Sequence, residues 1–154
     1  MNSSDREKIK LLLDSTYLLP IIGVEVEGVE KALKTLKRLR EEGKAEYYYT
    51  PFNILEILGK LSKVKYSRER VSMGLHAITE EFKFVYQTAE GCLKALNLRS
   101  LGHRDLIDLL LYATALERGI KLLTRDRSLV GFLEEKGEAT ESILREDELL
   151  ELYG

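Results

Sequence analysis

The sequence predicts an α/β fold, with one domain over residues 1–154 built as an α/β/α sandwich around a mostly parallel central sheet. Short apolar runs alternate with longer segments of helical spacing, as expected when strands and helices alternate along a chain. The runs at 9–14 and 120–124 are apolar at most positions, which is typical of parallel strands covered by helices on both faces. A length of 154 residues with 44% hydrophobic residues suits one compact core.

The first half of the chain begins with a strand and ends with two consecutive helices. The predicted order is strand 9–14, helix 28–42, strand 45–50, helix 52–64 and helix 67–81. Gly43 is a stop signal directly after the first helix. Thr50 and Pro51 suit the N-cap and first position of the second helix, because proline tolerates the first helical turn.

The second half repeats the alternation. The predicted order is strand 82–87, helix 89–98, helix 104–118, strand 120–126 and helix 128–137, followed by one more strand and a short helix. The helix at 104–118 is almost wholly apolar past Asp108, which predicts a central position. Its first turn should therefore lie close to the ends of neighbouring strands.

The composition excludes several classes of protein. A net charge of −2 gives no long-range positive field of the kind that marks many nucleic-acid-binding proteins. Cys92 is the single cysteine, which rules out an intrachain disulfide and a cysteine-rich zinc site. The first ten residues lack the apolar core of a signal peptide, and no apolar run approaches the roughly 20 residues that a bilayer requires. We expect a cytoplasmic protein without membrane contact.

Acidic residues recur where predicted strands end. Asp14 and Asp126 each follow an apolar strand. Ligand sites in open parallel sheets lie beyond the carboxyl ends of the strands, so both residues belong to one edge. Each also has a structural interpretation, because aspartate is common in turns and at helix N-caps. His76 and His103 are too few and too far apart to anchor a histidine-based metal site on their own.

Three further acids belong to predicted helices. Glu56 is the one acid in the apolar run 52–61, where a carboxylate is costly unless it is paired, bound to metal or at the helix margin. Asp105 and Asp108 share one face at the start of a helix, where they can cap it or point into a site. Packing does not require acids at all these places, so together they predict an acidic site.

Three known enzyme chemistries can be tested against the sequence, and none has the motif that it requires. No glycine-rich loop ends in Lys-Ser or Lys-Thr, which excludes a P-loop nucleotidase. Asp14 is followed by Ser15 and Thr16, without a second acid two residues on, which argues against an aspartyl-phosphate nucleophile. No arrangement of serine, histidine and aspartate suggests acyl transfer.

The ordered combination of these blocks resembles the PIN-domain nucleases, including the VapC-type toxins. "LLLDSTYLLP" looks like the family's first strand with its acid, and "TPFNILEILGKL" looks like the second motif. "DLLLYATALERGIKLLTRD" is similar to the most specific block, an acid that opens a helix and another after the next strand. The corresponding acids are Asp14, Glu56, Asp108 and Asp126, with Ser15 and Thr124 at positions where hydroxyl residues often support the site.

The sequence departs from the family pattern at three places. Asp105 is an extra acid that can share the role of Asp108 or support it. Ser128 stands where some members have a further acid, and the segment 64–81 is longer and more polar than a minimal toxin needs.

The resemblance implies a metal-dependent endoribonuclease that uses Mg²⁺ or Mn²⁺, ions that take oxygen ligands. Asp14 and Asp126 would be direct ligands, and Glu56 and Asp108 would bind directly or through water. A bound ion relieves the repulsion between the carboxylates, attracts the phosphate and activates a water. The resemblance also implies a homodimer and a small antitoxin partner of the VapBC type.

Two other functions remain open from sequence: a non-catalytic PIN-like module that binds RNA or protein, and a metal phosphatase acting on small phosphomonoesters. For RNA, basic residues on the borders of the site could contact phosphates, although most such charges simply face solvent. The basic residues are Lys60, Lys63, Lys65, Arg68, Arg70, Arg99, Arg104, Arg125 and Arg127.

Overall fold

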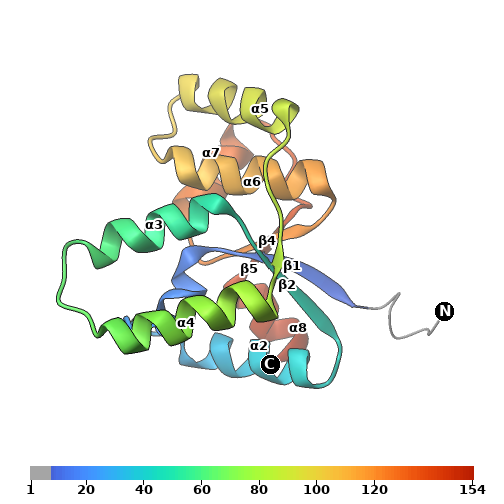
Figure 1. Ribbon diagram of the computed structural model, residues 1–154. Coiled ribbons are helices and arrows are strands. Elements are labelled where there is room, and N and C mark those ends of the chain that lie inside the picture. The colour runs from blue at the N-terminus through green and yellow to red at the C-terminus, as the bar shows by residue number, and fades with distance from the viewer. Residues whose placement is uncertain (1–7) are drawn as a thin grey trace.

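A central parallel sheet organises the structure, a computed structural model that describes residues 8–154 (Figure 1). Within these residues the sheet has five strands in the order β3-β2-β1-β4-β5. The strands are β1 (Ile9–Leu13), β2 (Ala45–Tyr49), β3 (Lys83–Phe84), β4 (Lys121–Thr124) and β5 (Ile143–Arg145). All four neighbouring pairs are parallel, which confirms the predicted fold class.

Helices connect the strands and cover both faces of the sheet. The α-helices are α2 (Glu30–Glu41), α3 (Pro51–Leu61), α4 (Arg68–Glu81), α5 (Ala89–Ser100), α6 (Leu106–Arg118), α7 (Arg127–Glu135) and α8 (Glu146–Tyr153), and two 3₁₀ turns, η1 (Ser15–Tyr17) and η2 (Leu19–Ile22), follow β1. Side chains alternate along β1, so Leu11 and Leu13 pack on one face and Leu12 on the other. The first face packs against α2, α4 and α8, and the second against α5, α6 and α7 (Figure 1).

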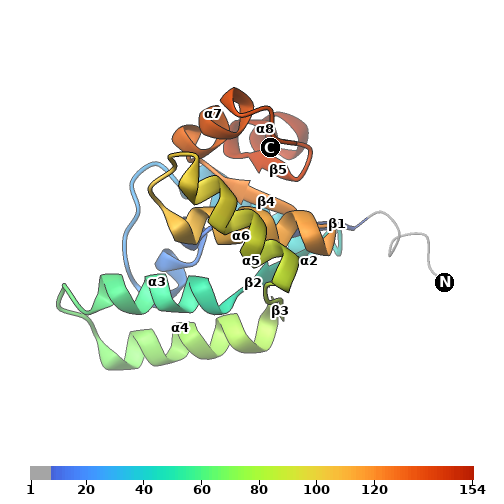
Figure 2. The ribbon, with the colours of Figure 1, turned by 90° about the horizontal axis from the view of Figure 1, so that it is seen from above.

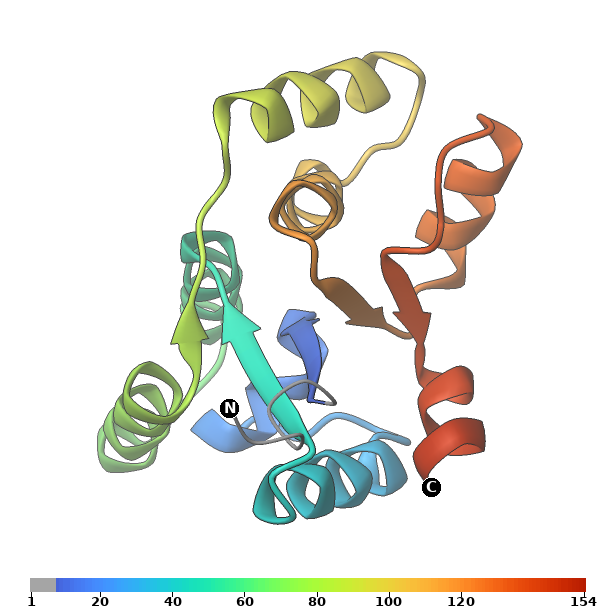
Figure 3. The ribbon, with the colours of Figure 1, turned by 90° about the vertical axis from the view of Figure 1, so that its right-hand side faces the viewer.

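The central position predicted for the helix at 104–118 is confirmed. Seen from the side, α6 lies between α5 and the sheet (Figure 3). Leu109 and the consecutive residues 111–115 are therefore buried. This explains why the helix is apolar all round rather than amphipathic. The burial fixes the first turn of α6 next to the sheet edge.

Several element boundaries differ from the predicted ones. The predicted strand at 82–87 is only Lys83–Phe84, because it is an edge strand that pairs with Tyr48 and Tyr49 of β2 and nothing beyond. The predicted helix at 28–42 begins at Glu30, since Gly28 has a positive φ of 77°.

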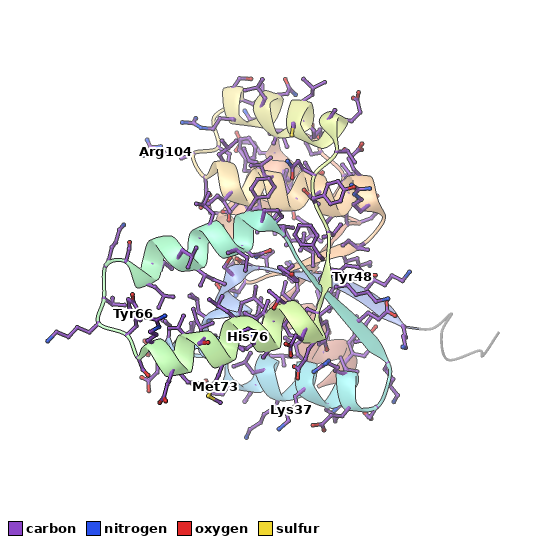
Figure 4. All side chains as sticks on the ribbon, in the orientation of Figure 1. Lys37, Tyr48, Tyr66, Met73, His76 and Arg104 are labelled. Carbon is purple, nitrogen blue, oxygen red and sulfur yellow. The ribbon has the colours of Figure 1, made fainter. Side chains whose placement is uncertain are left out.

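A helical hairpin projects from the body of the molecule. Helices α3 and α4 run side by side and are joined by the loop at 62–67 (Figure 2). Tyr66 is exposed in this loop (Figure 4).

Across residues 8–154, no helix is both long enough and apolar enough to cross a membrane.

Candidate metal centre

The carboxyl ends of β1 and β4 bring Asp14 and Asp126 to the same edge of the sheet. Asp14 follows the last residue of β1, and its backbone N–H donates to the Leu123 carbonyl of β4 at 3.2 Å. Asp126 lies two residues beyond the end of β4. Parallel pairing of these strands therefore places the two acids together, as their positions after apolar strands predicted.

Thr124 links these two acids directly. Its hydroxyl donates to Asp14 Oδ2 at 3.2 Å and accepts from the Asp126 backbone N–H at 3.0 Å. Thr124 itself is buried and its two partners are half-buried, so both hydrogen bonds are partly shielded from water. The predicted supporting position of Thr124 has this structural basis.

Asp126 has two roles in the geometry. Its side chain is the N-cap of α7, where Oδ1 accepts from the backbone N–H groups of Ser128 at 2.9 Å and Leu129 at 3.2 Å. Only Oδ1 is engaged in capping, so Oδ2 is available for another partner. The structural and the functional interpretation of this residue therefore both apply.

The first turn of α6 brings Asp108 against the same edge. Asp105 is the N-cap of α6 and accepts from the Asp108 backbone N–H at 3.1 Å. Burial, a hydrogen bond to the Asp126 carboxyl and the nearby charges of Asp105 and Asp14 raise the pKa of Asp108 to about 9. Asp108 and Asp126 line the same cavity, and Asp108 is half-buried there, whereas Asp105 is exposed at the border.

Asp14 is also perturbed by its surroundings. Burial, followed by the charge of Glu56, raises the pKa of Asp14 to about 6. Hydrogen bonds from Thr124 and from the backbone N–H groups of Ser15 and Thr16 act in the opposite direction. Glu56 of α3 thus lies close enough to Asp14 to repel it, and all four predicted acids are connected.

Asn53 ties α3 to the end of β1, and sequence reasoning missed it. Its fully buried side chain donates to the Leu13 carbonyl at 2.9 Å and to Ser15 Oγ at 3.1 Å. Its Oδ1 accepts from the Thr50 N–H at 2.8 Å and from the Thr50 hydroxyl at 2.9 Å. Asn53 and Glu56 are one helical turn apart, so this network sets the position of Glu56. The available signal was a polar residue three positions after Thr50, in a capping box.

Two cavities meet at Asp126. One, of about 490 Å³, is lined by Asp105, Asp108, Asp126, His103 and Arg104 together with Gly102, Ser128 and Phe132. The other, of about 590 Å³, lies between α7 and α8 and includes Thr124, Arg125, Arg127 and Arg145. His103 was not among the predicted site residues.

The predicted basic borders are exposed. The five residues of the α3–α4 region, Lys60, Lys63, Lys65, Arg68 and Arg70, lie on the hairpin, and Arg99 is on α5. Arg104 lies in the loop before α6 and extends away from the body (Figure 4). Arg125 is partly engaged, since it donates to the Glu27 carbonyl at 2.9 Å and lies 3.9 Å from Glu146. Arg127 lines the larger cavity.

The donor set suits a hard divalent cation. It consists of carboxylate oxygens, the ligands that Mg²⁺ and Mn²⁺ prefer. In the part of the chain from residue 8 onward, no three His, Cys, Asp or Glu side chains are close enough together to hold one ion jointly. Mg²⁺ is often held by one or two carboxylates and several waters, so a pair of direct ligands with the remaining acids at longer range fits this arrangement.

The chain belongs to the PIN-domain family, whose model matches residues 11–132. The matched region contains all four acids and the sheet edge that joins them. This confirms the resemblance noted from the sequence blocks. PIN domains are generally nucleases and typically use divalent metal ions.

Solved structures of the same fold include toxin–antitoxin proteins. One is VapBC2 from Rickettsia felis, bound to a DNA fragment from its promoter. It shares 13% sequence identity with this chain at a TM-score of 0.63, and the match covers 89% of this chain and 97% of that one. A toxin–antitoxin complex from Klebsiella pneumoniae is 14% identical with a TM-score of 0.60, covering 88% and 97%. VapC20 from Mycobacterium tuberculosis, a toxin that cleaves the sarcin–ricin loop, is 16% identical with a TM-score of 0.57, covering 80% and 97%. No curated protein matches the chain.

Proposed function

We propose that this protein is a Mg²⁺- or Mn²⁺-dependent endoribonuclease that hydrolyses RNA phosphodiester bonds. The observation that carries the proposal is the convergence of three acids at one edge of the sheet: Thr124 hydrogen-bonds to both Asp14 and Asp126, and the half-buried Asp108 lines the same cavity as Asp126. Buried carboxylates repel one another, and a bound divalent cation removes this repulsion. Capping accounts for Asp105 and Asp126, but it does not account for Asp14 and Asp108 at the same edge.

In this proposal the acids divide the binding of the ion among them. Asp14 and Asp126 are direct ligands, and Glu56 and Asp108 act directly or through water. Ser15 and Thr124 orient Asp14, and Asp105 supports Asp108 from the helix N-cap. A bound ion supplies attraction for the scissile phosphate and activation of water.

Cations at the border of the site would bring the RNA to it. The acidic centre repels RNA phosphates, so substrate must be attracted by neighbouring positive side chains. Arg104 and Arg127 suit this role, because both are exposed and line the cavities that meet at Asp126.

We further propose that the protein is the toxin of a VapBC-type pair, acting in the cytoplasm as a homodimer and inhibited by a small antitoxin. Support comes from the shared fold with VapBC2, with the Klebsiella pneumoniae toxin–antitoxin complex and with VapC20. A short neighbouring gene for a DNA-binding protein, and a stable complex of the two products, would support this assignment. Sedimentation showing a monomer at working concentration would remove the dimer.

The enzyme assignment is tested by cleavage of a structured RNA with Mg²⁺ or Mn²⁺, with EDTA as the metal-free reference. Asp14→Asn and Asp126→Asn should each reduce the cleavage rate by at least about 100-fold. This is more than the loss expected when only a hydrogen-bond partner of a metal ligand is removed. Asparagine is a good N-cap, so Asp126→Asn preserves the start of α7 while removing the charge. The matched control is Glu151→Gln, an exposed carboxylate on α8, which should cleave at the wild-type rate.

Each alternative has its own signature in this assay. Cleavage that persists in Asp14→Asn and Asp126→Asn would show that these acids are not the metal ligands. RNA binding without cleavage in any divalent ion would indicate a non-catalytic module. Hydrolysis of a small phosphomonoester with intact RNA would indicate a phosphatase.

A further inference from the structure

His103 contains a buried polar atom that the fold alone does not explain. The residue lies in the short loop between α5 and α6 and is only 8% exposed. Its Nε2 atom has no hydrogen-bond partner within residues 8–154. Most buried side-chain nitrogens in folded proteins are paired, so an exception of this kind calls for a specific cause.

The surroundings of the His103 ring fix its direction. Its centroid lies 5.0 Å from that of Phe132 on α7, with an angle of 43° between the rings. Its Nε2 atom lies 3.7 Å from Asp108 Oδ2. The ring therefore lies next to both α7 and the first turn of α6, with its unpartnered nitrogen near one of the four acids.

The distance from Nε2 to Asp108 is slightly too long for a hydrogen bond but short enough to become one. An N–H···O bond spans about 2.7–3.2 Å, so a small rotation of the carboxylate closes the gap. A neutral imidazole can have its proton on Nε2 and donate it to this oxygen. Because a carboxylate has two oxygens, Asp108 can accept from His103 at Oδ2 and still offer Oδ1 to the site.

We propose that His103 is a positioning residue of the metal centre: its Nε2–H holds Asp108 Oδ2 and so sets the orientation of the Asp108 carboxylate beside Asp126. The inference rests on the proposed function, because the orientation of Asp108 matters through the ion that the acids bind. Hydrogen-bond partners behind metal ligands commonly fix the ligand's direction, and losing one costs about 10- to 100-fold in metal affinity.

A packing role for His103 makes a different prediction. If the ring only filled space against Phe132, phenylalanine would fill it as well and would remove the unpaired nitrogen. His103→Phe should then leave metal affinity unchanged and stability equal or higher. If His103 positions Asp108, the same variant should fold but bind metal more weakly.

The test is calorimetric titration of the full chain with Mn²⁺ alone, without RNA. The deciding pair is His103→Gln and His103→Asn, since the Gln side-chain nitrogen reaches the place of Nε2 and the Asn nitrogen does not. We expect His103→Gln to bind Mn²⁺ within a few-fold of wild type, and His103→Asn and His103→Phe to bind about 10- to 100-fold more weakly. Thermal melting establishes that each variant is folded. If only one of His103→Asn and His103→Phe folds, that variant alone suffices for the comparison with His103→Gln.

The control is His76, the second histidine of the chain. It also lies near a carboxylate, 3.9 Å from Glu80, but it is exposed on α4 far from the α5–α6 loop (Figure 4). His76→Phe should leave Mn²⁺ affinity unchanged. If wild type binds Mn²⁺ and all three His103 variants bind it equally well, the metal centre is supported but His103 does not position Asp108. If wild type itself binds no Mn²⁺, both the metal centre and the role of His103 are contradicted.

Discussion

The hydroxyl of Thr124 donates to Asp14 Oδ2 at 3.2 Å and joins the end of β4 to the acid that follows β1. The Thr124 hydroxyl oxygen also accepts a hydrogen bond from the backbone N–H of Asp126. One buried hydroxyl thus fixes the relative position of the two acids proposed as direct ligands.

Replacing Thr124 by valine tests this link. Thr124→Val keeps the shape but leaves Asp14 Oδ2 and the Asp126 N–H without this partner, so the free energy of unfolding should fall by about 1–3 kcal/mol. Urea denaturation measures the change. The control is Thr79→Val on α4, whose exposed hydroxyl bonds only to helix carbonyls and should change stability by less than about 0.5 kcal/mol. Equal stabilities of the two variants would contradict the role of Thr124.

Asn53 should contribute strongly to the stability of the protein through its link between α3 and the end of β1. Asn53→Leu removes two donors to the end of β1 and the acceptor of the Thr50 backbone N–H, all of them buried. Leaving these groups unpaired should lower the free energy of unfolding by more than about 2 kcal/mol. Chemical denaturation tests this against Asn97→Leu, an exposed position on α5. If Asn53→Leu has the same free energy of unfolding as wild type, apolar contacts rather than these hydrogen bonds hold α3 in place.

The acid cluster should make the metal-free protein less stable as the pH rises. The pKa values of Asp14 and Asp108 are raised to about 6 and about 9, so both groups favour the protonated state when folded. Their stabilisation is complete below the unfolded pKa near 4 and is lost as the pH passes through each folded pKa. Asp108→Asn has no such ionisation, so its unfolding free energy in EDTA should increasingly exceed that of wild type from pH 4 to pH 9. A difference that stays constant with pH, or narrows, would show that Asp108 is not buried against other charges.

Asp126 offers a way to separate helix capping from metal binding. Asp126→Asn keeps the acceptor for the Ser128 and Leu129 N–H groups, whereas Asp126→Ala removes it and should cost about 1 kcal/mol of stability. Both variants should lose Mn²⁺ binding, because neither has a charged ligand. Thermal unfolding and Mn²⁺ titration of the same samples separate the two effects. Metal binding retained in Asp126→Asn would reassign the direct ligand.

The sequence predicted the sheet and its acidic edge because both depend on local patterns. Apolar runs such as 9–14 identify buried parallel strands, and an acid directly after such a run must lie at the carboxyl edge. The helix starts at Asp105 and Asp126 were similarly visible, since capping is a local interaction.

Asn53 and His103 could not be assigned in this way. The partners of Asn53 at Leu13 and Ser15 are about 40 positions away, with |i−j| values of 40 and 38. The position of His103 depends on tertiary packing, because Phe132 of α7 lies against its ring. The length of β3 also depends on tertiary structure, because an edge strand extends only as far as its single neighbour pairs with it.

The hydrogen bond between Thr124 and Asp14 joins residues 110 positions apart, which has a consequence for the nascent chain. During synthesis, β1, α3 and the start of α6 all emerge before β4, so the acids stay separate until that last partner arrives. Such a distant closure is slow compared with helix formation. A ribosome-bound or prematurely terminated fragment that stops short of Thr124 lacks both this hydrogen bond and Asp126. The proposed metal centre would therefore be incomplete in such a fragment.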